Sequence, residues 1–249
     1  STSVGSRLLS TETTLGGTIG QHRRWGWVEG DLDTIKAVKN AFGGTVNDVI
    51  LTAVTGGFRD LLASRGIDMR PLQIQSMIPV SMRTPGDSTG GNQVSAMFAQ
   101  LPIGVDDPVE RLHAMTRQME RVKKSGTPLT VDPIIGLADF VPPMLFATAG
   151  RVAANVNLRA FDTVTTNVPG PQIPLYLLGR ELQSLIPFVP LGPGVRISTA
   201  IVSYNGTINF GVTADYDSVR DLPVFLDGVR KTLDGLRKAV LAEIARRPD

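Results

Sequence analysis

Cysteine is absent from this 249-residue chain, and histidine occurs only twice, as His22 and His113. Without cysteine there is no disulfide, no thiolate nucleophile and no cysteine-ligated metal. Two histidines so far apart in sequence also exclude a histidine-rich metal site, so no metal is expected. The composition fits a reducing cytoplasm.

A strong charge of one sign and long apolar runs are also lacking. The formal net charge is only +2, and the basic residues are scattered without interleaved aromatics, which argues against nucleic acid as a partner. No apolar run is long enough to cross a membrane, and the first residues lack the regions of a signal peptide. Nucleotide phosphate loops and a Gly-x-Ser-x-Gly elbow are missing as well, which removes support for nucleotide chemistry and for that type of hydrolase.

The sequence does contain enough apolar residues, 42% of the total, to form a large core. Apolar spacing predicts helices over residues 31–42, 45–65, from 107 and from 223, the last with a buried stripe ending at Ile244, and an apolar, proline-broken helical pair over 131–155. Strands are predicted over 72–80, 94–101, 161–168, 181–187, 195–204 and 207–214. Asn205-Gly206 joins the last two as a hairpin turn. The order predicts an α/β (α+β) fold, with a mixed, mostly antiparallel sheet and helices packed against it.

The first 22 residues are rich in Ser, Thr and Gly and show no periodicity. They are typical of an extended arm or linker. No internal repeat or linker divides the remainder, so residues 23–249 are expected to form one domain.

The segment Val164 to Pro171 changes abruptly from a β-branched run into Pro-Gly-Pro. The backbone must stop pairing there. One interpretation is an ordinary strand followed by a proline-locked turn. The other is that Thr165, Thr166 and Asn167 lie at a strand end facing open space, where small polar groups can grip a substrate or a developing negative charge.

Thr45-Val46-Asn47-Asp48 is predicted to start a helix. Thr45 can cap the amide of Asp48, and the Asp48 carboxylate favours the positive end of the helix dipole. Capping explains Thr45 and Asp48, but it does not explain Asn47, whose side chain is free to point toward a neighbouring surface.

Other polar residues have two interpretations each. Arg83 lies where a predicted strand leads into a loop that contains Gly91 and Asn92. Such a loop either allows the backbone to approach a ligand closely or simply connects two strands. Arg83 can pair with a phosphate or with a nearby carboxylate. His113 is favoured as a structural histidine on an amphipathic helix, and His22 as a solvated loop residue.

Together, the motifs resemble the carboxy-terminal half of the bacterial wax ester synthase/diacylglycerol acyltransferases. They run in the family's order from about residue 15 to 240, and each is weak alone, while the ordered set is fairly specific. They are Arg23-Arg24-Trp25, Asp31-Leu32 with Lys36, Gly44-Thr45-Val46-Asn47-Asp48-Val49, Pro79-Val80-Ser81-Met82-Arg83, Gly91-Asn92, Leu101-Pro102, Asp107-Pro108-Val109-Glu110-Arg111-Leu112, Asn167-Val168-Pro169-Gly170-Pro171 and Ser203-Tyr204-Asn205-Gly206.

The resemblance implies a chloramphenicol acetyltransferase-like fold, in which two similar halves enclose a tunnel. In that family the amino-terminal half carries a His-His-x-x-x-Asp-Gly motif whose second histidine is the general base. This chain has no adjacent histidines. The resemblance therefore implies half an enzyme: residues 1–22 are the arm leading from a missing half, residues 23–249 are the carboxy-terminal domain, and the histidine-bearing half is the partner. Such a half is expected to be inactive alone and to expose a large apolar face where its companion docks.

The implied reaction is acyl transfer from acyl-coenzyme A, a substrate and not a cofactor, to diacylglycerol or a long-chain alcohol. No separate cofactor is implied. The resemblance makes Thr165, Thr166 and Asn167 the oxyanion candidates and Asn47 and Asp48 their structural support. It places Arg83, Gly91, Asn92, Pro169 and Gly170 toward the substrate and coenzyme. The apolar stretch 134–146 either lines an acyl tunnel or packs in the core.

Two alternatives stay open from the sequence. One is a non-catalytic lipid-binding module of the same fold, and the other is a polyketide-associated type of acyltransferase that uses carrier-protein substrates. The implied location is cytoplasmic. Lipid substrates are compatible with peripheral attachment to the inner membrane or to lipid inclusions, although no amphipathic helix demands it.

Overall fold

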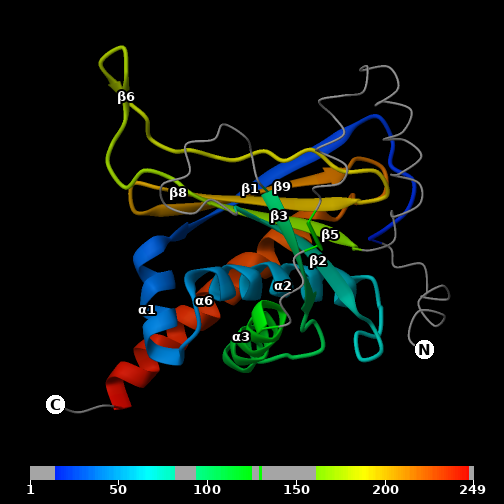
Figure 1. Cartoon of the computed structure of the whole chain (residues 1–249), viewed down its shortest axis with the longest axis horizontal. Helices are drawn as coiled ribbons and strands as arrows, with labels where there is room; N and C mark the ends of the chain where they lie inside the picture. The colour runs from blue at the N-terminus through cyan, green and yellow to red at the C-terminus, as the bar shows by residue number, and fades with distance from the viewer. Residues whose placement is uncertain (1–14, 82–93, 125–128, 131–160, 247–249) are drawn as a thin grey trace.

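The computed structural model describes residues 15–81, 94–124, 129–130 and 161–246, and shows a twisted sheet with helices on one face (Figure 1). The strands are β1 (Arg23–Asp31), β2 (Ile74–Ser81), β3 (Val94–Leu101), β4 (Leu129–Thr130), β5 (Thr163–Pro169), β8 (Ile197–Tyr204) and β9 (Thr207–Asp215), with a separate small pair, β6 (Tyr176–Leu177) and β7 (Arg180–Glu181). The helices are α1 (Leu32–Phe42), α2 (Val46–Ser64), α3 (Pro108–Lys124) and α6 (Leu222–Arg246).

The main sheet has the order β1-β9-β8-β5-β2-β3-β4. Among the described strands, β5 is parallel to both of its neighbours, β8 and β2, and the other pairings are antiparallel. The predicted mixed, mostly antiparallel sheet with packed helices is therefore confirmed. The two parallel pairings place the final residues of β5 and β8 together at one end of the sheet.

Helix starts follow the capping chemistry that the sequence indicates. The Asp31 side chain accepts a hydrogen bond from the Thr34 amide at the start of α1, and Thr45 and Asp48 form a reciprocal capping box at the start of α2. Gly66, with φ of 70°, follows α2 and provides the left-handed conformation that commonly ends helices. The Asn205-Gly206 turn is confirmed, with φ values of 44° and 82°.

Helix α2 lies at the centre of the core and packs closely against α6. A Cβ atom on Gly57 would lie 2.9 Å from the Phe225 carbonyl oxygen, and one on Gly228 would lie 2.8 Å from the Gly56 carbonyl oxygen. Only glycine lets the two helices approach so closely. The helix-facing side of the sheet, including Ile201 and Phe210, completes the same apolar core.

The structure differs from the predicted elements at three places. Strand β1 was not predicted, and it pairs along its whole length with β9. The strand expected over residues 181–187 is wrong beyond Glu181, because the chain there crosses the open face of the sheet, where the Leu185 carbonyl accepts a hydrogen bond from Asn209. The Ile244 side chain is 63% exposed, since α6 extends beyond the layer it packs on.

The last residues of the expected arm contact the domain. Leu15 is fully buried in the core, and the Gly17 amide donates to the Gly194 carbonyl at 3.1 Å. The helical pair expected over residues 131–155 lies outside the described residues. No helix in the described part of the chain has the length and apolarity needed to span a bilayer.

Candidate functional site

The end of β5 meets the start of α2, and this contact joins two motifs that are 120 residues apart. Side chains alternate along a strand, and Thr163, Thr165 and Asn167 pair in register with core-facing residues of β2 and β8. The Asn167 Nδ2 atom lies 3.5 Å from Asn47 Oδ1 as a long hydrogen bond. The structure therefore brings together the predicted oxyanion candidate Asn167 and the predicted supporting residue Asn47.

Thr165 and Thr166 lie on opposite faces of the sheet. Thr165 is 1% exposed, and its hydroxyl accepts a hydrogen bond from Ser76 Oγ at 2.9 Å. The expectation that this hydroxyl faces open space is wrong, because strand alternation turns it into the core. Thr166 is half-buried on the other face, and its hydroxyl forms no hydrogen bond within the part of the chain that the structure describes. The two hydroxyls therefore cannot serve one oxyanion together.

Asp48 organises the start of α2. Its Oδ2 atom accepts from the Thr45 amide at 2.8 Å, and its own amide donates to Thr45 Oγ1 at 3.2 Å. The carboxylate is 2% exposed, so the cap is held inside the protein. Asp48 thus sets the backbone from which Asn47 projects, and the predicted capping by Thr45 is confirmed.

Asp48 also has a free oxygen in the protein interior. Its Oδ1 atom and the Thr116 hydroxyl are both buried and without a partner among the described residues. A Cβ on Gly44 would lie 2.6 Å from Thr116 Oγ1 and 3.1 Å from Asp48 Oδ2. With a φ of 82° as well, position 44 requires glycine, which lies against Asp48 and Thr116 just before the start of α2.

The Pro-Gly-Pro turn after β5 is fixed to the end of β8. The Gly170 amide donates to Ser203 Oγ at 3.2 Å, and Gln172 Nε2 donates to the same oxygen at 3.0 Å. A Cβ atom at Gly170 would collide with the Ser203 carbonyl oxygen. Pro169 is exposed beside them. The turn is therefore a rigid boundary of the candidate site.

The β8–β9 turn is bonded both to this boundary and to the start of α1. The Gly206 amide donates to Gln172 Oε1 at 3.0 Å, and the Leu32 amide donates to the Gly206 carbonyl at 2.9 Å. The Asn205 amide donates to the Pro171 carbonyl at 3.1 Å. Gln172, Ser76 and Ser203 were missed as site-supporting residues, since their roles depend on strand neighbours that no local pattern reveals.

Several predicted residues lie elsewhere. Arg83, Gly91, Asn92 and the stretch 134–146 are outside the described residues. His113 is exposed on α3, with Nε2 3.2 Å from the Phe42 carbonyl, and the His22 ring stands edge-on to Tyr216 with centroids 6.2 Å apart. Within the described ranges, no cluster of histidine and carboxylate side chains could hold a metal ion.

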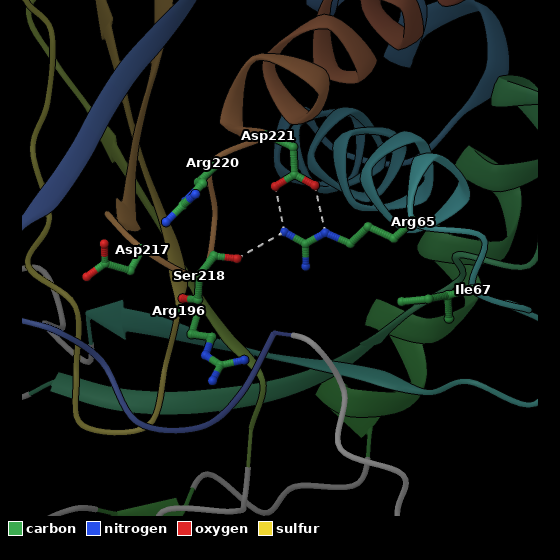
Figure 2. A pocket seen from close by; sticks show the side chains of 7 residues that line it. All are labelled: Arg65, Ile67, Arg196, Asp217, Ser218, Arg220 and Asp221. Atoms are coloured by element: carbon green, nitrogen blue, oxygen red, sulfur yellow. Dashed lines mark hydrogen bonds and ion pairs between the residues drawn. The ribbon is translucent and has the colours of Figure 1, made fainter.

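A shallow cavity of about 530 Å³ lies at the end of the sheet opposite Asn167 (Figure 2). Arg65 forms a two-pronged pair there with Asp221, with Nε–Oδ2 at 2.7 Å and Nη2–Oδ1 at 2.6 Å. Hydrogen bonding from Arg65 lowers the pKa of Asp221 below its ordinary value. A second cavity of about 310 Å³ is lined in part by Arg117 and Arg121. Neither contains a predicted site residue.

Comparison with known families gives two matches in this chain. Residues 90–237 match the WS/DGAT C-terminal domain, and residues 2–50 match the wax ester synthase/diacylglycerol acyltransferase catalytic domain. The chain is similar to the probable diacylglycerol O-acyltransferase tgs1 of Mycobacterium tuberculosis, with 33% identity covering 89% of this chain and 48% of the relative. It is also similar to the putative diacylglycerol O-acyltransferase Rv3371 of the same organism, with 30% identity covering 87% and 45%.

Solved structures share the fold. The wax ester synthase/diacylglycerol acyltransferase from Marinobacter aquaeolei VT8 superposes with a TM-score of 0.71 at 24% identity, covering 91% of this chain and 51% of that one. The epimerization domain of tyrocidine synthetase B gives a TM-score of 0.58 at 14% identity, covering 96% and 56%. The chain spans about half the length of the curated relatives it matches.

Proposed function

The chain belongs to the wax ester synthase/diacylglycerol acyltransferase family, and from this premise we propose that it is the carboxy-terminal half of an acyl-coenzyme A-dependent O-acyltransferase. The acceptor is the hydroxyl of a diacylglycerol or of a long-chain alcohol. The observation that carries the proposal is the family match over residues 90–237, which includes β5 and its site residues.

The length of the chain supports a missing companion. Relatives named as diacylglycerol O-acyltransferases are about twice as long as this chain. The described residues offer no histidine near Asn47 or Asn167, since His113 is on α3 against Phe42 and His22 is beside Tyr216. We therefore assign the general base to an amino-terminal half, the expected carrier of the His-His-x-x-x-Asp-Gly motif.

In the proposed reaction, the companion's histidine takes the proton of the acceptor hydroxyl as its oxygen attacks the thioester carbonyl carbon. A carbon–oxygen bond forms and the carbonyl oxygen becomes an oxyanion. The carbon–sulfur bond then breaks, and the departing coenzyme A thiolate takes the proton back from the histidine. The products are an ester and free coenzyme A.

The neutral amide at the end of β5 suits the oxyanion step. Asn167 Nδ2 is a donor whose hydrogen bond to Asn47 is long, at 3.5 Å, so little is lost when it turns to a developing negative charge. We assign Asn167 as the donor and Asn47, set by the Asp48 cap, as the residue that orients it. Thr166 is assigned to the opposite face, and Thr165 to holding β5 against β2.

The remaining predicted contacts are assigned to substrate binding. Pro169 and Gly170 bound the site where the chain leaves β5, and their position favours contact with the acyl-coenzyme A thioester. Arg83, Gly91 and Asn92 are assigned to the coenzyme entrance on the family resemblance alone. Peripheral association with membrane or lipid inclusions follows from the lipid acceptors.

Reconstitution of the two halves tests the proposal. The purified chain is mixed with the histidine-bearing half, and ester formation from palmitoyl-coenzyme A is followed with hexadecanol or dioleoylglycerol as acceptor. The chain alone is expected to be inactive and the pair active. Asn167→Ala is expected to lower kcat of the pair, while Asn209→Ala, a matched amide elsewhere on the sheet, leaves the kcat of the folded pair unchanged.

Two results would contradict the proposal. An associated pair that turns over neither acceptor indicates the non-catalytic lipid-binding module. Turnover with an acyl carrier protein but not with acyl-coenzyme A indicates the carrier-protein type of acyltransferase.

A further inference from the structure

The cavity of about 310 Å³ forms where three separate segments of the chain meet. Helix α3 supplies Arg117, Gln118 and Arg121 to its lining, the loop before β2 supplies Arg70, and the end of β3 supplies Gln100. The volume is at the lower end of the range for small-molecule sites. The cavity is therefore large enough for a small polar ligand or for the headgroup of a lipid.

This cavity is remote from the candidate site for acyl transfer. Its lining includes Leu101, the last residue of β3, which pairs with Ile74 at the start of β2. Strand β2 is parallel to β5, and Asn167 lies toward the other end of these two strands. At the usual rise per residue, about 20 Å of strand separates the cavity from Asn167. A ligand in the cavity would occupy a site of its own.

The lining of the cavity is positively charged. It contains Arg70, Arg117 and Arg121, and the described residues of the lining include no aspartate or glutamate. The larger cavity differs, because its arginines share the lining with two aspartates, and one of these, Asp221, is paired with Arg65. The smaller cavity thus brings cations together without supplying the anions that would neutralise them.

The two arginines of α3 have no ion-pair partner in the part of the chain that the structure describes. Both are exposed and lie one turn apart on the helix, and like charges at that spacing destabilise a helix. Basic residues in a last turn complement the helix dipole. This accounts for Arg121 but not for Arg117, because only Arg121 lies in the last turn. An anion bound beside both guanidinium groups would offset their repulsion.

The third arginine is oriented by a neighbouring carboxylate. Arg70 Nε donates to Asp68 Oδ1 at 3.0 Å, and Nη2 donates to Asp68 Oδ2 at 2.9 Å. Its Nη1 atom forms no hydrogen bond to any described residue, so this nitrogen is available to a ligand. Asp68 offsets one of the three positive charges, and the remaining charge of about +2 matches that of a phosphate monoester at neutral pH.

The rest of the lining is largely apolar, and part of it is held in place by hydrogen bonds. Leu72, Pro102 and Ile103 contribute to it. Arg59 Nη1 donates to the Ile103 carbonyl at 2.8 Å, and the Val105 amide donates to the Pro102 carbonyl at 3.2 Å. A preformed lining lowers the entropy lost on binding. Apolar surface beside the arginines suits the carbon skeleton of an ester better than inorganic phosphate.

We propose that the cavity lined by Arg70, Arg117 and Arg121 binds a phosphate monoester. The planar guanidinium group presents paired N–H donors that match phosphate oxygens, and three such groups from two segments line the same space. The phosphate belongs either to a lipid headgroup, as in phosphatidic acid, or to a soluble ester, as in glycerol 3-phosphate. This inference does not depend on the proposed acyl transfer.

Binding of two probes to the 249-residue chain tests the proposal. Cosedimentation measures its affinity for vesicles of equal parts phosphatidylcholine and phosphatidic acid, and isothermal titration calorimetry measures its affinity for glycerol 3-phosphate. The chain is expected to bind at least one probe. The double variant Arg117→Gln/Arg121→Gln is expected to weaken that binding at least about tenfold, since two charge-assisted contacts are lost. Its melting temperature is expected to stay equal or rise, because the like-charge pair is removed.

Two control variants distinguish a defined site from general attraction between charges. Lys123→Gln/Lys124→Gln removes the same charge from the end of the same helix, at positions outside the described lining, and is expected to leave the affinity nearly unchanged. Arg117→Lys keeps the charge but removes the planar fork, and is expected to weaken binding. An equal loss of affinity in the lysine double variant overturns the proposal, as does full affinity in both arginine variants.

The two probes also identify the source of the phosphate. If the arginine double variant loses vesicle binding and the chain does not bind glycerol 3-phosphate, the ligand is a lipid headgroup. If the variant loses glycerol 3-phosphate while vesicle binding is absent or unchanged, the ligand is a soluble ester. Loss of both shows that the phosphate monoester is recognised in either form. A chain that binds neither probe overturns the proposal, and ester formation by the reconstituted pair tests the proposed function separately.

Discussion

The two ends of the sheet differ in chemistry. At the end where β5 and β8 finish, the candidate site presents amides and a hydroxyl, from Asn47, Asn167 and Ser203, and its one carboxylate, Asp48, is buried in the α2 cap. At the other end, charged pairs link separate elements: Arg65 with Asp221, and Arg23 with the buried Asp215, whose closest atoms are 3.7 Å apart. The ion pairs at this end link elements that are distant in the sequence.

The difference also shows why cavity size is a poor guide to this molecule. The 530 Å³ cavity lies beside the Arg65–Asp221 pair (Figure 2), whereas the predicted residues that the structure describes lie where β5 ends and α2 begins, and line neither cavity. A site completed by a second half presents an open surface until that half is bound. On the proposed function, the charged end serves stability and the neutral end, where Asn47 and Asn167 meet, serves chemistry. Each of the following predictions tests that division.

The largest expected effect is on activity at the neutral end. Asn167→Ala removes the assigned oxyanion donor, and loss of one such donor typically lowers kcat on the order of 100-fold. Its hydrogen bond to Asn47 is long, at 3.5 Å, so the urea midpoint of the isolated chain is expected to change little. A large fall in the midpoint together with kcat would assign Asn167 to stability instead.

Arg65→Ala is expected to lower the stability of the chain and to leave kcat unchanged, which is the reverse of Asn167→Ala. The variant leaves the Asp221 carboxylate, 31% exposed, without its two-pronged partner, and we expect a loss of about 1–2 kcal/mol in the free energy of unfolding, allowing for solvent screening. Chemical denaturation measures it. The kcat of the reconstituted pair, measured well below the melting temperature, stays at the parent value if the division is correct.

Thr165→Val tests the reassignment of one oxyanion candidate. The substitution removes the 2.9 Å partner of the buried Ser76 hydroxyl and leaves it only the Met77 carbonyl at 3.5 Å, a loss that costs about 1 kcal/mol. The kcat of the folded pair is expected to be unchanged. A kcat loss as large as that of Asn167→Ala would return Thr165 to the chemical step.

The smallest effect is a pH dependence at the charged end. Arg65 lowers the pKa of Asp221 in the folded chain, so the pair stabilises the fold fully above the ordinary carboxyl pKa of about 4, and this contribution is lost as pH falls through the lowered folded value. The difference in unfolding free energy between the chain and Asp221→Asn is therefore expected to shrink between about pH 5 and pH 2. A difference that is constant with pH would contradict this.

The sequence predicted elements whose signals are local. The helix starts at Asp31 and Thr45 and the Asn205-Gly206 turn follow from capping and turn chemistry within a few residues. Strand β1 was missed because Gly26 and Gly30 interrupt its pattern. Both glycines lie closely against side chains of the core, since a Cβ would lie 2.7 Å from Leu226 Cδ1 at position 26 and 3.2 Å from Ile208 Cγ2 at position 30.

The site was predicted as separate motifs and not as an assembly. Nothing local to Asn47 or Asn167 indicates that their side chains meet, because the contact depends on how α2 crosses β5. The opposite directions of Thr165 and Thr166 follow from strand alternation, but which of them enters the core depends on the pairing with β2 and β8. Long-range strand order was the missing information.

The hydrogen bonds of the β8–β9 turn restrict the length of this loop. Surface hairpin tips normally tolerate insertions, but Gly206 holds both Gln172 and the first amide of α1, and the Asn205 amide is bonded to Pro171. Lengthening this loop by even one residue would disrupt its bonds to two segments at once, the Pro171-Gln172 turn and the start of α1. Homologues that vary in size are therefore expected to keep these two positions at fixed spacing, and an epitope tag or a new terminus is better placed in the exposed bend at Arg70-Pro71.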